Sequence, residues 1–276
     1  MKFLKLFLNF YLNASIHVGL AVFSFVRITE HYFDLTFNNN LDFFIFFGTI
    51  TGYNFVKYAG VAKLHHRTLT NNLKVIQVFS FFSFLAMCYF GYFISVITIL
   101  YLTPLILLTI LYAVPFLSGF HKSLRQVSYL KIIVVALVWA GFTVLIPCLD
   151  AGKEISLNVI LLTLQRFLIV IVLILPFDIR DVKYDAISLQ TIPKKIGIEK
   201  TKRLGLGIMV FSLVLEYAIN ASGISKNVFM IFFFLTLIFL MRSKMNQSKY
   251  YSSFFVESLP IIWWLLLLGI HNLQEF

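Results

Sequence analysis

Three aspartates, spaced three and four residues apart in a short polar segment, are the side chains of this sequence most suited to chemistry: Asp178, Asp181 and Asp185. On a helix, a rotation of about 100° per residue places them within about 60° of one another on one face, with Arg180 and Lys183 on the far side. Carboxylates on one face repel one another unless a cation lies between them, and Mg²⁺ binds carboxylate and phosphate oxygens. The same spacing is also compatible with a solvated helix of mixed charge.

The position of this segment favours a site. Pro176 lies directly before it, where the sixth apolar run of the chain ends at Phe177. Proline removes a backbone donor, and such an interruption at membrane depth occurs mainly where protein or a wet cavity lines the break. We therefore give the functional and the solvated interpretations about equal weight from the residues alone.

The elements that must position these residues are apolar runs, each near the roughly 20 residues that a helix needs to cross hydrocarbon. Of the 276 residues, 60% are hydrophobic and 13% charged, whereas about a quarter are charged in average globular proteins. The runs are 8–27, 42–62, 74–93, 96–117, 131–149, 157–177, 204–222, 227–241 and 251–271. The alternating ten-residue segments of a barrel are absent from the sequence. We predict an all-α integral membrane protein of about nine transmembrane helices, forming one domain over 1–276.

The placement of charge predicts the orientation. If the N-terminus is cytoplasmic, basic residues fall in the inner segments, as the positive-inside rule requires. The outer segments hold only Arg27, Lys153 and Lys226, beside several acids. The formal net charge of +11 is thus explained by topology. Because the basic residues are dispersed over short loops, no nucleic-acid partner is expected.

Among the polar side chains inside the runs, four are singled out because their burial in lipid is costly, so that a cavity or a partner is expected. They are Gln165, Arg166, Glu216 and Glu257. We expect Arg166 to pair with Glu216 or with Glu257.

The segment DIRDVKYD, followed by TIPKKIG, resembles the second aspartate motif of the UbiA superfamily of intramembrane prenyltransferases. Its D-x-x-x-D core matches Asp181 and Asp185, with a further aspartate at Asp178. The nine-helix layout fits the same family over nearly the whole chain. Weaker similarities occur at Tyr112 and Pro115 with the basic residues that follow, and in the run YYSSFFVESLPII, which contains Glu257.

The first aspartate motif of the family, N-D-x-x-D-x-x-x-D, has lost its acids in this chain. Asn54 matches the asparagine, but the three acidic positions hold Phe55, Tyr58 and Ala62. Lys57 shares the helical face of Asn54 and Tyr58. In the second motif, Gln190 occupies a position where lysine is usual.

The resemblance implies that an isoprenyl diphosphate lies with its tail between helices and its diphosphate at the cytoplasmic mouth. Mg²⁺ would be held by Asp178, Asp181 and Asp185, with one ion more plausible than a full cluster. The resemblance gives Asp181 and Asp185 catalytic roles, and the isoprenyl group would pass to a membrane-soluble acceptor, aromatic or lipid. Substrate-binding roles are expected at Asn54, Lys57, Tyr112, Arg125, Lys131 and Glu257. Lys57 could replace a lost metal ion as a point charge toward phosphate.

Two other functions stay open. One is a catalytically inactive homologue that binds an isoprenoid lipid or acts as a scaffold, because decay of the first motif would produce the same sequence. The other is a small-solute transporter, which ranks last because no paired interrupted helices of an inverted repeat are found. We favour a transferase in the bacterial plasma membrane.

Overall fold

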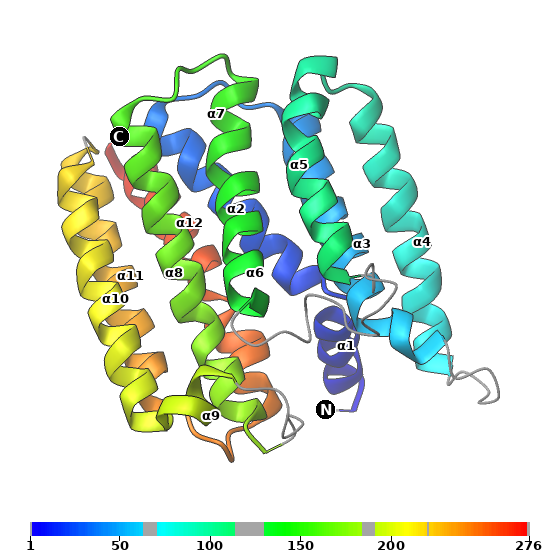
Figure 1. Ribbon diagram of the computed structural model, residues 1–276. Helices are drawn as coiled ribbons and strands as arrows, with labels where there is room; N and C mark the ends of the chain where they lie inside the picture. The colour runs from blue at the N-terminus through cyan, green and yellow to red at the C-terminus, as the bar shows by residue number, and fades with distance from the viewer. Residues whose placement is uncertain (1, 63–70, 114–129, 184–190, 220, 275–276) are drawn as a thin grey trace.

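A computed structural model describes residues 2–62, 71–113, 130–183, 191–219 and 221–274, and every regular element among them is helical. Figure 1 shows the helices as a bundle in which most run roughly side by side. Their bounds are α1 (Lys2–Asn13), α2 (Ile16–Phe33), α3 (Asn39–Ala62), α4 (Asn71–Tyr92), α5 (Val96–Ala113), α6 (Leu130–Ala140), the π-helix η2 (Gly141–Leu145), α7 (Ile146–Asp150), α8 (Leu157–Asp181), α9 (Ile192–Ile196), α10 (Ile198–Ala218), α11 (Gly223–Arg242), the π-helix η3 (Tyr251–Val256) and α12 (Leu259–Gln274).

Each of the nine predicted runs coincides with a helical segment, so the all-α prediction is confirmed. Six segments are long and apolar enough to cross a membrane, and α1 with α2 makes a seventh if the bent pair is one span. The segments α3 and α10 are not among them. The chain is an integral membrane protein, while the count of nine crossings and the cytoplasmic N-terminus stay predictions.

The first predicted run, 8–27, is not one straight helix. Ser15 adopts the left-handed backbone conformation, with φ 62°, and α1 meets α2 at 60°. Such a conformation costs a non-glycine residue free energy and persists where surrounding contacts fix it. Two residues of α3 supply such contacts: the Ser15 hydroxyl donates to Asn54 Oδ1 at 2.7 Å and accepts from Lys57 Nζ at 2.8 Å. The break therefore joins the start of the chain to α3.

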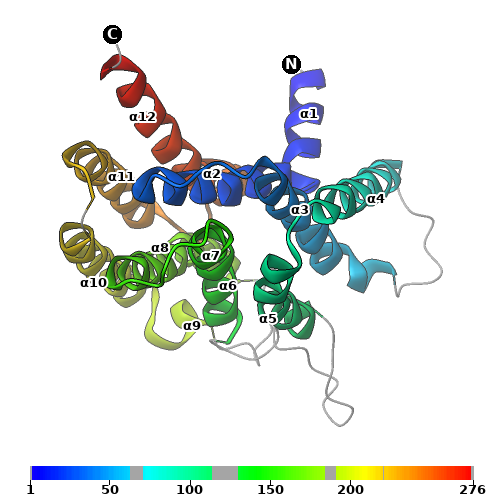
Figure 2. The same cartoon turned by 90° about the horizontal axis from the view of Figure 1, so that it is seen from above.

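The core lies where α2, α8, α11 and α12 pack together. Its centre is aromatic: Trp263 is fully buried, stacks on Phe232 with ring centroids 4.5 Å apart, and meets Phe25 edge to face. Seen from above, α8, α10 and α11 group on one side and α3, α4 and α5 on the other (Figure 2). The outer surfaces of α4 and α5 expose many large apolar side chains, as expected of lipid-facing helices.

The expected ion pairs of Arg166 are not formed among the described residues. The guanidinium is fully buried, donates to the Phe25 carbonyl at 3.3 Å and lies 4.0 Å from the centroid of the Phe25 ring. Glu216 instead accepts from Tyr32 OH and from Gln165 Nε2, both at 2.8 Å. Neutral donors thus satisfy this buried carboxylate, and the arginine is held by an aromatic face.

Candidate active site

A cavity of about 670 Å³ lies between the two groups of helices. Its walls are mostly apolar and come from α1, α2, α3, α4, α5, α6, η2, α8, η3 and α12. Aromatic rings form part of them, and Trp139 Nε1 donates to Tyr53 OH at 3.1 Å inside the cavity. The aromatic side chains that line it are Phe44, Tyr53, Tyr112, Trp139, Phe142 and Phe177. A space of this kind suits a hydrocarbon chain more than a polar solute.

The charged side chains that line the cavity include residues near the ends of α3 and α8 and at the start of α6, and Figure 1 shows these helix ends at one end of the bundle. Four are cationic and two are carboxylates: Lys57, Lys131, Arg180, Lys249, Asp181 and Glu257. The cavity is therefore apolar along its length and has an excess of positive charge at one end.

The end of α8 supplies the aspartates of the second motif. The sequence predicts that the sixth span ends near Pro176, but α8 continues through this proline to Asp181. The Pro176 carbonyl accepts from Gln247 Nε2 at 2.9 Å, and the same amide donates to Ser252 at 2.8 Å. The segment before η3 is thus attached to α8 at the proline.

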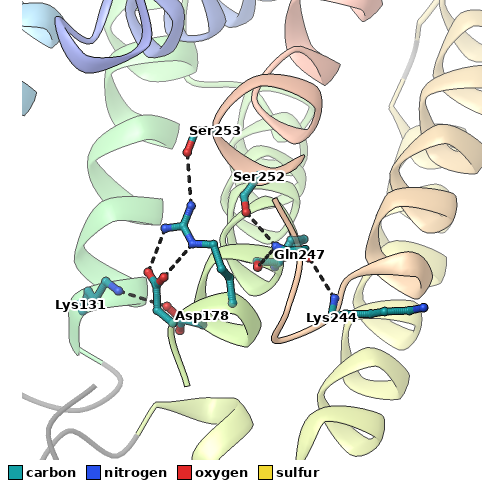
Figure 3. Close-up of polar contacts among 9 residues, drawn as sticks. Lys131, Asp178, Lys244, Gln247, Ser252 and Ser253 are labelled. Atoms are coloured by element: carbon teal, nitrogen blue, oxygen red, sulfur yellow. Dashed lines mark hydrogen bonds and ion pairs between the residues drawn. The ribbon is translucent and has the colours of Figure 1, made fainter. Parts of the chain in front are cut away.

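Each of the two described aspartates is paired with a cation. Asp178 is fully buried, and Lys131 Nζ donates to its Oδ1 at 3.1 Å (Figure 3). Arg180 donates to both oxygens of Asp181, from Nε at 2.7 Å and from Nη2 at 3.1 Å, and donates from Nη1 to Ser253 Oγ at 3.3 Å. The partial negative charge at the C-terminus of a helix disfavours carboxylates, and a paired cation offsets this repulsion.

This arrangement corrects the expectation that Arg180 and Lys183 project away from the carboxylate face. Arg180 lines the cavity beside Asp181, because its long side chain spans the 100° between adjacent helical positions. Lys183 does turn away, and it donates to Asn246.

The end of α3 supplies the residues of the first motif. Asn54 does not line the cavity; it donates to the Ala14 carbonyl at 3.0 Å and to Ser80 Oγ at 2.8 Å, which ties α3 to the break after α1 and to α4. Lys57 does line it, and its ammonium donates to Ser15 Oγ at 2.8 Å and to the Leu12 carbonyl at 3.4 Å.

Glu257 and Tyr112 complete the predicted set within the cavity wall. Glu257 follows η3 and is close enough to Lys57 and Arg180 to interact electrostatically with both. Tyr112 lies near the end of α5. The structure thus brings Lys57, Tyr112 and Glu257 to one cavity.

Lys131 and Asp181 line the same cavity, whereas Asp178 lies behind its surface. Arg125 and Asp185 lie outside the described residues. The roles assigned to all of these residues stay predictions.

Sequence reasoning missed several polar residues of the cavity. Lys249 donates to Asn9 Oδ1 at 2.8 Å, and Tyr250 OH donates to the same oxygen at 2.8 Å. Both Lys249 and Asn9 line the cavity, as does Ser253. A basic residue directly before the ninth run was a usable signal for Lys249. The spacing of Asn9, Asn13 and His17 predicts one interior face on the first helix, but not the contact of Asn9 with Lys249, which joins positions 240 residues apart.

The described residues do not fit a divalent metal ion. No group of three His, Cys, Asp or Glu side chains among them is arranged to hold one. Both oxygens of Asp181 are occupied by Arg180, and Asp178 pairs with Lys131. The Mg²⁺ prediction also includes Asp185, so it is neither confirmed nor excluded by these contacts.

The fold is UbiA-like, as two solved structures show. The chain is similar to a UbiA homologue from Archaeoglobus fulgidus bound to DMAPP and Mg²⁺, with a TM-score of 0.60 and 14% identity over 95% of this chain and 99% of that one. It is also similar to a digeranylgeranylglyceryl phosphate synthase, with a TM-score of 0.56 and 17% identity over 98% and 97% of the two chains. No protein-family model matches the sequence, and no curated protein does. These likenesses show the fold.

Proposed function

Given its UbiA-type fold, we propose that this protein transfers an isoprenyl group from an isoprenyl diphosphate to a membrane-soluble acceptor, aromatic or lipid. The observation that carries the proposal is the single cavity, apolar along its length and lined by cations at one end. A prenyl chain would lie against the apolar walls, and the diphosphate would meet the cations. The similar structures support the proposal, because one of them is bound to DMAPP and Mg²⁺ and another is a digeranylgeranylglyceryl phosphate synthase.

In the proposed reaction, the allylic C–O bond breaks and its electron pair leaves with the diphosphate. The allylic carbocation then bonds to the acceptor, which gives up a proton. Lys57 and Arg180 would donate hydrogen bonds to the departing oxygens, where negative charge grows as the bond breaks. Donors fixed in a cavity of low dielectric stabilise such charge more than water does.

The apolar walls would exclude water from the carbocation and so prevent its hydrolysis. Since the described residues do not fit Mg²⁺, no step here depends on the metal. We place the activity in the bacterial plasma membrane, with the charged end of the cavity toward the cytoplasm, where diphosphates are soluble.

The test is release of diphosphate by purified protein given labelled isoprenyl diphosphates of several lengths and a membrane extract as the source of acceptor. We expect turnover by the wild type, with a loss of about 10²-fold in Lys57→Ala and Arg180→Ala, the range for removal of one donor to developing charge. Lys202→Ala is the matched control, because Lys202 pairs with exposed Glu199 outside the cavity. Asp181→Ala and Asp185→Ala test the roles that the second motif assigns.

A second candidate is a homologue that binds an isoprenoid lipid without turnover. The observation that favours it is the replacement of all three acids of the first motif by Phe55, Tyr58 and Ala62. Saturable binding of the labelled diphosphates, with no diphosphate release at any chain length, would establish this candidate and refute transfer.

A further inference from the structure

At the charged end of the cavity, the cations have donors available to a ligand, whereas the described aspartates are already paired. A metal site would require the opposite. We infer that the cavity binds the diphosphate of its substrate through Lys57, Arg180 and Lys249 directly, without a divalent metal ion. This inference rests on the proposed function, since it specifies how the same site holds the same substrate.

The two described carboxylates of the second motif, Asp178 and Asp181, are each paired with a cation of the protein. Asp181 has both oxygens within 3.1 Å of the Arg180 guanidinium, a two-point ion pair of the geometry that holds arginine and carboxylate together best. Asp178 is fully buried and accepts from Lys131. A metal ion at Asp181 would have to displace the guanidinium, and it would then lie close to a second positive charge.

The first motif supplies no compensating ligand. Its acidic positions hold Phe55, Tyr58 and Ala62. The amide oxygen of Asn54 accepts from the Ser15 hydroxyl at 2.7 Å, and its nitrogen donates twice within the protein. The charge on this face of α3 is the ammonium of Lys57, so an ion that bridges two sets of oxygens would meet oxygens on one side and a cation on the other.

The three cations keep donors for an anion. An ammonium group has three N–H bonds and a guanidinium has five. Lys57 uses two in its contacts with Ser15 and Leu12, Lys249 uses one with Asn9, and Arg180 uses three with Asp181 and Ser253. All three side chains line the cavity.

The positions of the cations suit a diphosphate. Lys57 lies five residues before the end of α3, Arg180 lies in the last turn of α8, and Lys249 precedes η3, so they approach the cavity from three separate segments. Across the whole lining, four cations oppose two carboxylates, and the excess of positive charge matches an anion. Charged hydrogen bonds of this kind are the strong ones.

The experiment measures binding of labelled farnesyl diphosphate to the full-length protein in detergent, once in excess EDTA and once in excess Mg²⁺. We expect the dissociation constant in EDTA to equal that in Mg²⁺ within about twofold. Lys57→Gln, Arg180→Gln and Lys249→Gln should each weaken binding in EDTA about tenfold or more, the loss of one charged hydrogen bond. Inorganic diphosphate should compete, while inorganic phosphate should compete less.

Lys244→Gln is the matched control. Lys244 is exposed at the same end of the molecule but does not line the cavity, and Figure 3 shows its side chain directed away from the Ser253 side of the site. Its binding should equal that of the wild type. Folding of every variant is checked by its thermal unfolding in the same detergent.

The outcomes separate the two proposals. Direct binding would be overturned, but the transferase kept, by one combined result. In that result, binding requires Mg²⁺, is abolished by Asp181→Asn and is unchanged in the three cation variants. No binding of farnesyl or longer isoprenyl diphosphates under either condition would overturn both.

Discussion

Lys57 is the charged residue of the first-motif segment, and it lines the cavity. Its ammonium lies between the break after α1 and the cavity, so a single lysine both fixes the Ser15 turn and carries charge to the site. Phe55, two positions earlier, is half exposed at 52% and does not line the cavity. Restoring an acid at Phe55 alone would therefore not place it in the wall of the site.

Glu216 is the clearest structural residue among the polar groups inside the helices. It is fully buried, and two side chains donate to it: Tyr32 from α2 and Gln165 from α8. It does not line the cavity. Its carboxylate therefore joins three helices and has no contact with the candidate site.

Glu216→Leu should destabilise the protein by about 1–3 kcal/mol for each donor left buried without an acceptor. Glu199→Leu is the control, because Glu199 is 77% exposed and its pair with Lys202 is a surface pair. Thermal unfolding in detergent measures the difference. A Glu216→Leu variant as stable as the Glu199→Leu variant would contradict the role given to this carboxylate.

At Gly205, α10 lies close against two neighbouring helices. A Cβ atom on Gly205 would lie 2.5 Å from Leu240 Cδ2 of α11 and 2.9 Å from Leu175 Cδ1 of α8. The absence of a side chain lets three helices meet at this level.

Gly205→Leu should therefore overpack the contact and destabilise the protein by about 1–3 kcal/mol. Gly207→Leu, on the same helix, is the matched control, since a Cβ there meets nothing within 4 Å and leucine has the higher helix propensity. Unfolding midpoints of the two variants in one detergent give the measurement. Equal midpoints would show that α10 is not fixed by this contact.

At the scale of elements, hydrophobic run length was sufficient to locate the helical segments. The predicted division between the runs 74–93 and 96–117 is real: α4 ends at Tyr92 and α5 begins at Val96. The break at Ser15 could not be predicted, because a contact with Asn54 and Lys57, far along the chain, stabilises it. The end of α8 could not be predicted either, because the contact of Gln247 with Pro176 joins positions 71 residues apart.

The candidate site, like the helices, could be predicted from the sequence only in part. Motif resemblance selected Lys57, Asp181 and Glu257, which one cavity brings together. It could not give the pairing of Asp181 with Arg180, because helical geometry alone places adjacent residues 100° apart. The partners of a flexible side chain depend on the cavity around it.

The whole molecule has two chemically different ends. Opposite the cationic end of the cavity, Arg27 pairs with Asp42 at 3.0 Å, and Asp150 accepts from Asn38 and Thr98. These residues belong to the segments predicted to be outer. The partition agrees with the charge pattern that predicted the orientation.

The orientation itself is tested by labelling single cysteines in whole bacterial cells. Both native cysteines, Cys88 and Cys148, are first replaced by serine. With a membrane-impermeant maleimide, Asp34→Cys should react from outside, and Lys244→Cys should react only after permeabilisation. The reverse pattern would place the N-terminus and the charged end of the cavity outside the cell.

At the end of α1, the ammonium of Lys57 is attracted from two sides. The Leu12 carbonyl belongs to the last turn of α1, where the helix carries partial negative charge, and it accepts from Lys57 at 3.4 Å. An anion in the cavity competes for that ammonium. The attachment of α1 to Lys57 lowers the affinity of the cavity for the anion. By thermodynamic reciprocity, a bound anion that draws Lys57 away weakens the attachment of α1 by the same free energy. The bend at Ser15 thus makes the first helix of the chain an energetic component of whatever binds in the cavity.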